Sequence, residues 1–414
     1  MPGQPMNRNR STNQKLPLLP LPLYRWLSLL TMLAVVVGCQ RTTQSTTEPS
    51  NNETTSTTQQ ISTEQAEPLP RAVQFLIKQQ NGNDHLWHSA HYGNLKDGAA
   101  ITAFVLYALS GTDHDANTQL QMAADRLASQ VQESGFVTNA DGPDYTNYGS
   151  AMLLLAGQDS GIQLADNVRQ QLVDYLVRSQ LDDEEGYVTS SVDFGGWDLS
   201  GWMTGERPTT GTNISVSVSV VRALATHRDQ PRVDKTFEQF NRWIDRVHNS
   251  QANDGDGGFY FHPKRNHDGN KAGWADGDSR QKTRSYGSST ADGLGILKAL
   301  GTDKDDERVK QAVQWVLQHD DLSLVPGFDH EQGEGSWSSG LRYYYYQSLS
   351  QSLDLFPPEE GQNIAKQIVT MLKNEQNKDG SWTNANARMR EDDPLIATGF
   401  AAIALKNCKN YLGE

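Results

Sequence analysis

Four aspartates stand where a carboxylate could act on a ligand. Asp97, Asp144 and Asp393 each come just before an apolar segment of helical pattern, and Asp292 lies inside another such segment. Carboxylates that gather at one place repel one another, and this raises the pKa of at least one toward the range of a general acid. We therefore expect Asp97, Asp292 and Asp393 to be candidate catalytic residues. Asp144 is a candidate ligand contact.

The aspartates that precede helices have a structural alternative. A carboxylate at the start of a helix accepts hydrogen bonds from free backbone N–H groups and stabilises the helix without touching a ligand. Asp393 followed by Pro394 is typical of such a cap and the first helical position. Helix capping and ligand contact both stay open for Asp97, Asp144 and Asp393.

Tyrosines accompany these acids. Tyr145 and Tyr148 follow Asp144, and Tyr344 belongs to the run of tyrosines at residues 343–346 that opens another helical segment. Four consecutive positions cover the whole circumference of a helix, so one or two of these rings should face a cavity. We expect Tyr145, Tyr148 and Tyr344 to contact a ligand, with packing in the core as the alternative.

These residues belong to a sequence unit that recurs six times. Each unit has an amphipathic segment, a glutamine near its end, a glycine-rich turn with an aromatic residue, and a second segment of small and apolar residues. The second segments of the first and last copies, residues 97–109 and 393–405, align without gaps. The turns contain Gln79–Gln80 with Trp87, Gln130 with Phe136, Gln180 with Tyr187, Gln251 with Phe259, Gln318 with Phe328 or Trp337, and Gln376 with Gly380 and Trp382.

A helix pair of this kind cannot cover its own apolar face, and stacking against neighbouring pairs buries it. The second segments are apolar nearly all round, so they should lie inside, while the charged first segments should face water. Six such pairs predict an all-α fold, a closed (α/α)6 toroid over residues 69–414. Residues 214–220 alternate with the period of two that indicates a strand. Because they occupy an inner-helix position in their repeat, we expect a helix there.

The turn of the last copy, Gln376 to Trp382, resembles the QW motif of squalene-hopene cyclases. The whole repeat, over about residues 70–408, resembles the toroid that these cyclases share with the β-subunits of protein prenyltransferases. The resemblance implies a structural role: the glutamine amide bonds carbonyls at the end of the outer helix, and the tryptophan packs over the turn. It identifies a fold, and function has to be argued from the site.

The active residues of those families are mostly absent from the matching positions. The acidic element of the cyclases falls on Ser289, Ala291 and Asp292, of which only Asp292 is acidic, and the Asp and Cys that bind zinc in prenyltransferases fall on Ser289 and Ala291. A lone carboxyl is not the polarised cluster that protonates an alkene. We therefore expect no zinc, no other metal and no cofactor, and disfavour triterpene cyclisation.

Two long loops contain further candidates. Trp197 and Trp202 lie in the loop at residues 193–211, where they could form a lid over the ring or anchor the loop by packing. His262 and His267 lie near the Gly- and Asp-rich residues 253–257, which could suggest a metal site. The spacing lacks the ligands of a calcium loop, so we expect a solvated turn.

The N-terminal region predicts export and lipid anchoring. Four basic residues precede a short apolar run that ends at Gly38 and Cys39. This arrangement resembles the lipobox of bacterial lipoproteins, which implies a signal peptide at residues 1–38 and lipid on Cys39. Residues 39–68 are rich in Thr, Ser and Gln and predict a disordered tether. We expect a protein of the cell envelope, held to a membrane by this lipid, outer membrane or periplasm-facing.

Composition narrows the partners. The formal net charge is -14, and the positive charges of the N-terminal region would leave with the signal peptide. Such an acidic chain disfavours nucleic acid as a partner. The cysteines are Cys39 and Cys408, and we expect Cys408 to be a buried apolar residue.

Three functions remain open at this point. We expect an anchored toroid that binds a small molecule, isoprenoid or glycan in its central cavity or mouth, without triterpene cyclase activity. The first alternative is a carbohydrate-active enzyme that uses paired carboxylates. The second is a divergent terpenoid cyclase that uses Asp292. Whether the protein is an enzyme stays open.

Overall fold

The computed structural model describes residues 67–138, 145–158, 161–184, 186–200, 211–264, 269–329 and 335–414. The predicted signal peptide, Cys39 and nearly all of the tether after it lie outside these residues. The helices described below belong to one unit, which runs from Ser62 to Glu414. Within the described residues, no helix is both long enough and apolar enough to cross a membrane.

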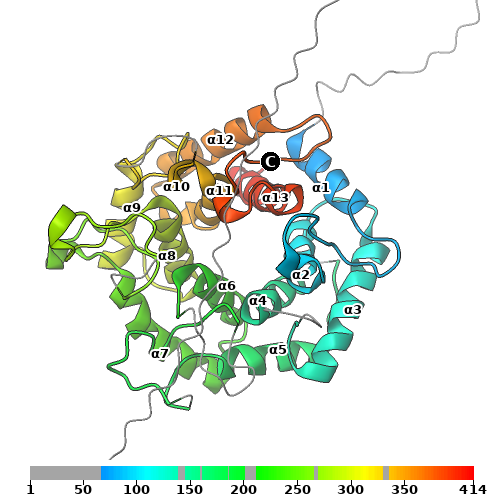
Figure 1. The fold of residues 1–414 in the computed structure, drawn as a ribbon, viewed down its shortest axis with the longest axis horizontal. Helices are drawn as coiled ribbons and strands as arrows, with labels where there is room; N and C mark the ends of the chain where they lie inside the picture. Colours follow the sequence, from blue (N-terminus) through cyan, green and yellow to red (C-terminus); the bar gives the residue numbers. More distant parts are fainter. Residues whose placement is uncertain are drawn as a thin grey trace, which may run out of the picture. The chain divides into compact units, whose positions relative to one another are not determined.

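Six inner helices form a closed ring (Figure 1). Each contacts the next along the chain, and the last one returns to contact the first. The inner helices are α2 (Ala99–Leu109), α4 (Thr146–Ala156), α6 (Ile214–Ala225), α8 (Gly287–Ala299), α11 (Arg342–Ser350) and α13 (Pro394–Leu412). The short α10 (Trp337–Gly340) directly precedes α11.

An outer layer of helices surrounds this ring (Figure 1). These are α1 (Pro68–Lys78), α3 (Asn117–Ser134), α5 (Asp166–Arg178), α7 (Pro231–Val247), α9 (Glu307–Leu317) and α12 (Pro358–Glu375). Outer and inner helices alternate along the chain, and α1 packs against α13, which joins the first repeat to the last. The predicted all-α toroid of six helix pairs is confirmed.

Burial follows the expected division between the layers. Every residue of α2 is buried, whereas α7 buries one face that includes Phe237, Phe240 and Trp243. The segment that begins at Ile214 is helical, as its place in the repeat predicted. Because α6 contacts both α4 and α8, nearly its whole surface is buried, and an alternating pattern loses its value as a strand signal.

In the last QW-like turn, the tryptophan bonds the end of the outer helix, a role that was expected of the glutamine. The indole N–H of Trp382 donates to the Leu372 carbonyl near the end of α12, at 3.0 Å. The Gln376 amide instead donates to the carbonyls of Gly380 and Pro68, each at 2.9 Å. The tryptophan therefore satisfies the outer-helix carbonyl, and the glutamine joins its own turn to the next outer helix.

The third repeat uses the same pair of residues, which corrects one sequence assignment. Gln180 donates to Gly195 and Thr236, and the indole of Trp197 donates to Leu176 on α5, at 2.8 Å. The aromatic residue that pairs with Gln180 in this turn is thus Trp197. The assignment of Tyr187 from the sequence was wrong, because a long insertion in the turn separates Gln180 from Trp197. Trp197 is fully buried, so it anchors the loop. Trp202 lies outside the described residues.

Gly380 allows a test of the ring closure between α12 and α1. Its φ is +93°, and a Cβ there would lie 2.5 Å from the Arg71 carbonyl oxygen on α1. Gly380→Ala should lower the free energy of unfolding by about 2 kcal/mol or more, because left-handed backbone and a steric clash both oppose it.

The matched control is Gly82→Ala, since nothing lies within 4 Å of a Cβ at that position. Urea unfolding of both variants measures the difference. Equal stability of the two variants would contradict the role assigned to the Gly380 turn.

Candidate functional site

A cavity of about 320 Å³ opens where the inner helices begin; we call it the upper cavity. All six inner helices contribute residues from their first turns or from the residues just before them. Its wall is largely aromatic and aliphatic, with Ile101, Phe104, Tyr148, Phe261, Tyr286, Tyr344 and Phe400. A concave, mostly apolar surface with a few polar groups is the usual form of a small-molecule site.

Cationic side chains from the preceding loops also line the upper cavity. They are Lys271, Arg388 and Arg390. The guanidinium of Arg390 lies 5.0 Å from the centroid of the Tyr92 ring, and the ammonium of Lys271 lies 3.9 Å from that of Phe261. Burial lowers the pKa of Lys271 to about 8, while the charge of Asp292 acts in the opposite direction. The cavity thus combines an apolar wall with positive charge.

Asp292 lies behind the cavity wall, with 1% of its surface exposed. It accepts hydrogen bonds from the hydroxyls of Ser215 and Tyr344, each at 2.9 Å, and of Ser348 at 2.7 Å. Burial raises its pKa to about 6, although these hydroxyls and the charge of Lys271 oppose the rise. Ser215 and Tyr344 line the cavity and Asp292 does not, so a ligand would contact the carboxylate through them.

The predicted tyrosines come together at this cavity. Tyr145, Tyr148 and Tyr344 all line it, from the starts of α4 and α11. Asp144 lies outside the described residues. Asp97 is exposed and lies two residues before the start of α2. The residue between them, Gly98, has a left-handed backbone with φ 85°. Asp97 does not line the upper cavity.

Asp393 is buried and fastens the last repeat to the first. One carboxylate oxygen accepts from the Leu395 N–H at 2.9 Å and caps α13, and the other accepts from the hydroxyl of Ser89. Next to it, Asp392 accepts from the hydroxyl of Tyr92. Asp97 and Asp393 therefore differ in role despite their equal positions in the alignment, because only Asp393 has a helix end and a facing loop to bind.

Sequence reasoning missed Glu391, which is fully buried. Its carboxylate accepts from the Tyr344 N–H and from the Asn384 amide, each at 2.8 Å, and thereby caps α11. Burial raises its pKa to about 7. The acidic run at residues 391–393 was the available signal, but the run alone does not indicate that Glu391 reaches a helix of another repeat. Lys271, on a loop, had no comparable signal.

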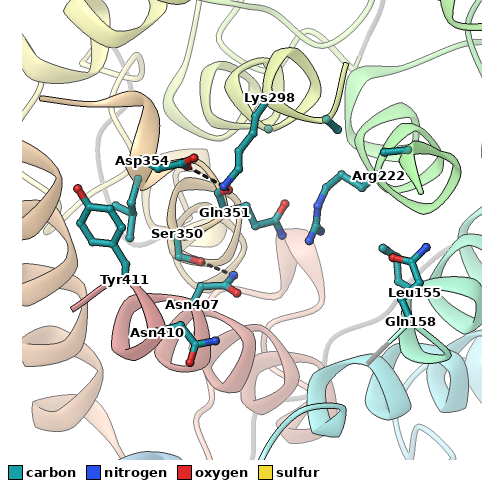
Figure 2. Close-up of a pocket in the computed structure, with 14 residues that line it drawn as sticks. Leu155, Gln158, Arg222, Lys298, Ser350, Gln351, Asp354, Asn407, Asn410 and Tyr411 are labelled. Atoms are coloured by element: carbon teal, nitrogen blue, oxygen red, sulfur yellow. Dashed lines mark hydrogen bonds and ion pairs between the residues drawn. The ribbon is translucent and has the colours of Figure 1, made fainter. Parts of the chain in front are cut away.

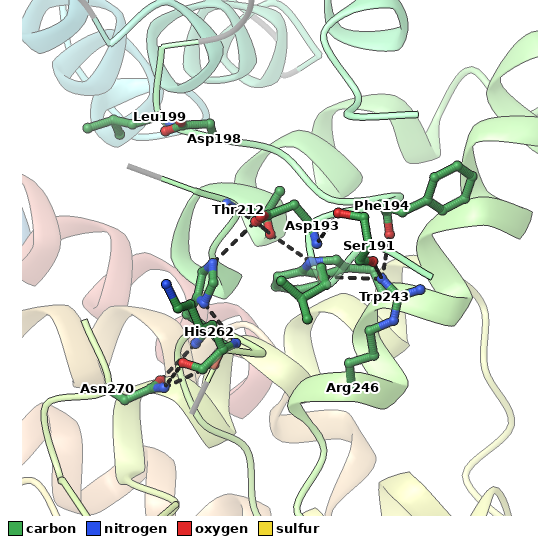
Figure 3. A network of polar contacts seen from close by, with 12 residues as sticks. Ser191, Asp193, Phe194, Asp198, Leu199, Thr212, Trp243, Arg246, His262 and Asn270 are labelled. Atoms are coloured by element: carbon green, nitrogen blue, oxygen red, sulfur yellow. Dashed lines mark hydrogen bonds and ion pairs between the residues drawn. The ribbon is translucent and has the colours of Figure 1, made fainter. Parts of the chain in front are cut away.

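Two loops beside the cavity are joined by a buried polar network (Figure 3). Asp193 accepts from the N–H and hydroxyl of Thr212, at 2.9 and 2.8 Å, and from Nε2 of His262 at 3.2 Å. Since Nδ1 of His262 accepts the Lys264 N–H, Nε2 carries the proton of the neutral ring. Burial alone would raise the pKa of Asp193, but the bonds from His262 and Thr212 lower it to about 2.

This network corrects the prediction of a solvated turn at His262. The imidazole is 2% exposed, because it packs under the loop that Asp193 closes. His267 lies outside the described residues. Within the described residues, no group of three His, Cys, Asp or Glu side chains is placed to hold a metal ion. Cys408 is buried in the core, as expected.

Comparison with known proteins places this geometry in a fold. No protein-family model and no curated protein matches the chain. The apo type II terpene cyclase MstE from Scytonema superimposes with a TM-score of 0.51 at 14% identity, covering 83% of this chain and 98% of that one. A protein from Actinoplanes gives 0.51 at 16% identity, covering 82% and 98%.

A third similar structure has another chemistry. The GH76A alpha-1,6-mannanase from Salegentibacter sp. HEL1_6 gives a TM-score of 0.51 at 13% identity, covering 83% of this chain and 98% of the mannanase. At such identities the likeness establishes the fold alone: a terpenoid cyclase-like α/α toroid, which is also used by glycosidases. Because one fold serves both, function depends on the residues of the cavity.

The burial of Asp292 makes stability depend on pH. Its pKa is raised on folding, so the protonated carboxyl is favoured at low pH and stability is lost as pH rises through about 6. Asp292→Asn mimics the neutral form. The free energy of unfolding of Asp292→Asn, measured relative to that of the wild type, should therefore be higher at pH 7.5 than at pH 4 by about 2–3 kcal/mol.

Urea unfolding at both pH values measures this difference. Asp234→Asn, at an exposed position on α7, is the control and should show nearly the same effect at both. A pH-independent effect of Asp292→Asn would refute the assigned raised pKa.

Proposed function

We propose that this toroid binds an isoprenoid-type amphiphile, a molecule with a long apolar chain and an acidic head group, in the upper cavity. The observation that carries the proposal is the lining: aromatic and aliphatic side chains from the six inner helices or the residues just before them, with Lys271, Arg388 and Arg390 on the adjoining loops. Burial of an apolar chain against such a wall is favourable by about 25 cal/mol per Å². The cations match an anionic head group.

A carbohydrate-active enzyme is less well supported by the same cavity. Hydrolysis of a glycosidic bond ordinarily needs two carboxyl groups that flank the bond. Among the described residues that line the upper cavity, none is Asp or Glu. Asp97 is exposed, and both carboxylate oxygens of Asp393 already bond protein groups.

A divergent terpenoid cyclase is the second candidate, and one observation favours it. Asp292 is a buried carboxyl with a pKa raised to about 6, so it holds a proton more readily than an ordinary aspartate. Against it, Ser215 and Tyr344 stand between this carboxyl and the ligand space. Binding without cyclisation is therefore the function that we propose.

Ligand binding can be tested by filling the cavity. Ile101 lines it, so Ile101→Trp should weaken binding of geranylgeranyl phosphate at least about tenfold by occupying the ligand space. Val188→Trp is the control, because Val188 is 64% exposed and outside the cavity. Displacement of the fluorescent probe N-phenyl-1-naphthylamine measures affinity. Geranylgeraniol, without the phosphate, should bind more weakly. Unchanged affinity in Ile101→Trp would place the ligand elsewhere.

We also propose that the protein is exported and anchored by lipid on Cys39. The basic, apolar and small residues before Cys39, followed by a polar segment, support this. Metabolic labelling with palmitate should mark the wild-type protein in its bacterial host, and Cys39→Ala should lose the label. Cys408→Ala, at the other cysteine, should keep it. A labelled Cys39→Ala protein would contradict the anchor.

A further inference from the structure

A second hollow, of about 620 Å³, lies where the inner helices end; we call it the lower recess (Figure 2). Its lining mixes aliphatic side chains, such as Leu155 and Leu353, with polar ones: Gln158, Arg222, Lys298, Gln351, Asn407 and Asn410, together with the carboxylate of Asp354. We infer that this recess binds an acidic saccharide, whose carboxylate contacts Arg222 and Gln351 while its hydroxyls contact the neighbouring amides. The inference does not depend on the function proposed for the upper cavity.

Arg222 has hydrogen-bonding capacity to spare. It lies on α6 and is half-buried, and one of its terminal nitrogens donates to the Tyr107 hydroxyl at 2.7 Å. Within the part of the chain that the structure describes, no carboxylate forms an ion pair with it. A guanidinium has five N–H groups in a planar fork that matches a carboxylate. Because it does not bond the end of its own helix, helix capping does not account for it.

Gln351 supplies a second donor at the same place. Its side chain is only 8% exposed, and its amide nitrogen is buried without a hydrogen-bond partner. Figure 2 shows the side chains of Gln351 and Arg222 both reaching into the recess. A buried donor without an acceptor costs free energy, and a ligand oxygen would remove that cost.

The other charges of the recess are largely engaged. Lys298 forms an ion pair with Asp354 at 2.6 Å and donates to the Gln351 carbonyl at 2.9 Å. Nearby, Lys406 donates to the Ser110 carbonyl at 2.6 Å. These lysines offset the partial negative charge of the helix ends. Arg222 is left as the cation that can neutralise a ligand.

Side-chain amides suit the remainder of a sugar. Asn410 is exposed, and Asn407 donates to Ser350 at 3.0 Å while its side-chain oxygen remains an acceptor. Gln158 is also exposed; its amide nitrogen donates to the Ala223 carbonyl and the Thr226 hydroxyl, at 3.0 and 2.9 Å, so its amide oxygen is the group left for a ligand. An amide both donates and accepts, as a hydroxyl does. Aromatic residues that include Phe104, Tyr148 and Tyr344 leave only about 10 Å³ between the two hollows, so the recess is a separate site.

Isothermal titration with D-glucuronate tests the inference. Wild type should bind glucuronate at least about tenfold more tightly than D-glucose, which lacks the carboxylate, or succinate, which lacks the hydroxyls. Arg222→Gln should abolish binding, and Arg222→Lys should weaken it by losing the paired contact. Arg232→Gln, the same change on the outer helix α7, should bind as wild type. Arg222→Gln should leave the affinity for N-phenyl-1-naphthylamine unchanged, which separates this site from the upper cavity.

Gln351→Leu is an independent variant that replaces the amide with an apolar side chain of similar size. It should weaken glucuronate binding about five- to tenfold, with an unchanged circular dichroism spectrum. Absence of saturable glucuronate binding, or equal binding of glucose or succinate, would overturn the inference. Wild-type affinity in either folded variant, Arg222→Gln or Gln351→Leu, would do the same.

Discussion

The structure depends on one constraint: an inner helix that is apolar all round must be covered on every side. Each of the six contacts its two ring neighbours, which is possible for the first and last only if the ring closes. The contact of α13 with α2 meets this requirement. Side chains reinforce it, through Gln376 at one end and Lys406, which donates to Ser110 at the other.

Closure also gives the ring two chemically different ends. All inner helices run in the same direction, so their positive ends meet at the upper cavity and their negative ends meet at the lower recess. The upper end accommodates the buried carboxyls of Asp292 and Glu391. The lower end holds cations such as Arg222 and Lys298. Among the described residues, the Gln351 amide nitrogen lacks a hydrogen-bond partner, and Arg222 donates to the Tyr107 hydroxyl and not to a helix-end carbonyl.

The repeat pattern predicted the fold because it reflects contacts that every copy shares. Thr102 and Thr398 were aligned by sequence alone, and each accepts the backbone N–H of its own turn's tryptophan, at 2.8 and 3.1 Å. The tyrosines of the upper cavity were predictable for the same reason, because position within a repeat determines which end of the ring a residue reaches.

Loops and contacts between repeats were not predictable in this way. Asp97 and Asp393 occupy equal positions, but only the loop at Ser89 faces a carboxylate across the closed ring. His262 was misjudged because its partner Asp193 lies on another long loop, and composition alone indicated a solvated turn. Glu391 caps a helix from a different repeat. Each depends on a tertiary neighbour that periodicity does not encode.

The surroundings of Asp292 illustrate how one toroid can serve different chemistries. Its carboxylate receives hydroxyls from α6 and α11, so it holds three consecutive inner helices together at the floor of the upper cavity. A carboxyl engaged in this way orients the Tyr344 hydroxyl, and Tyr344 is a residue that lines the cavity. An acid that protonates its substrate, or a pair that hydrolyses a sugar, needs direct access to the reacting atoms. Here burial and three hydroxyl partners give that carboxyl a positioning role, which favours binding over catalysis.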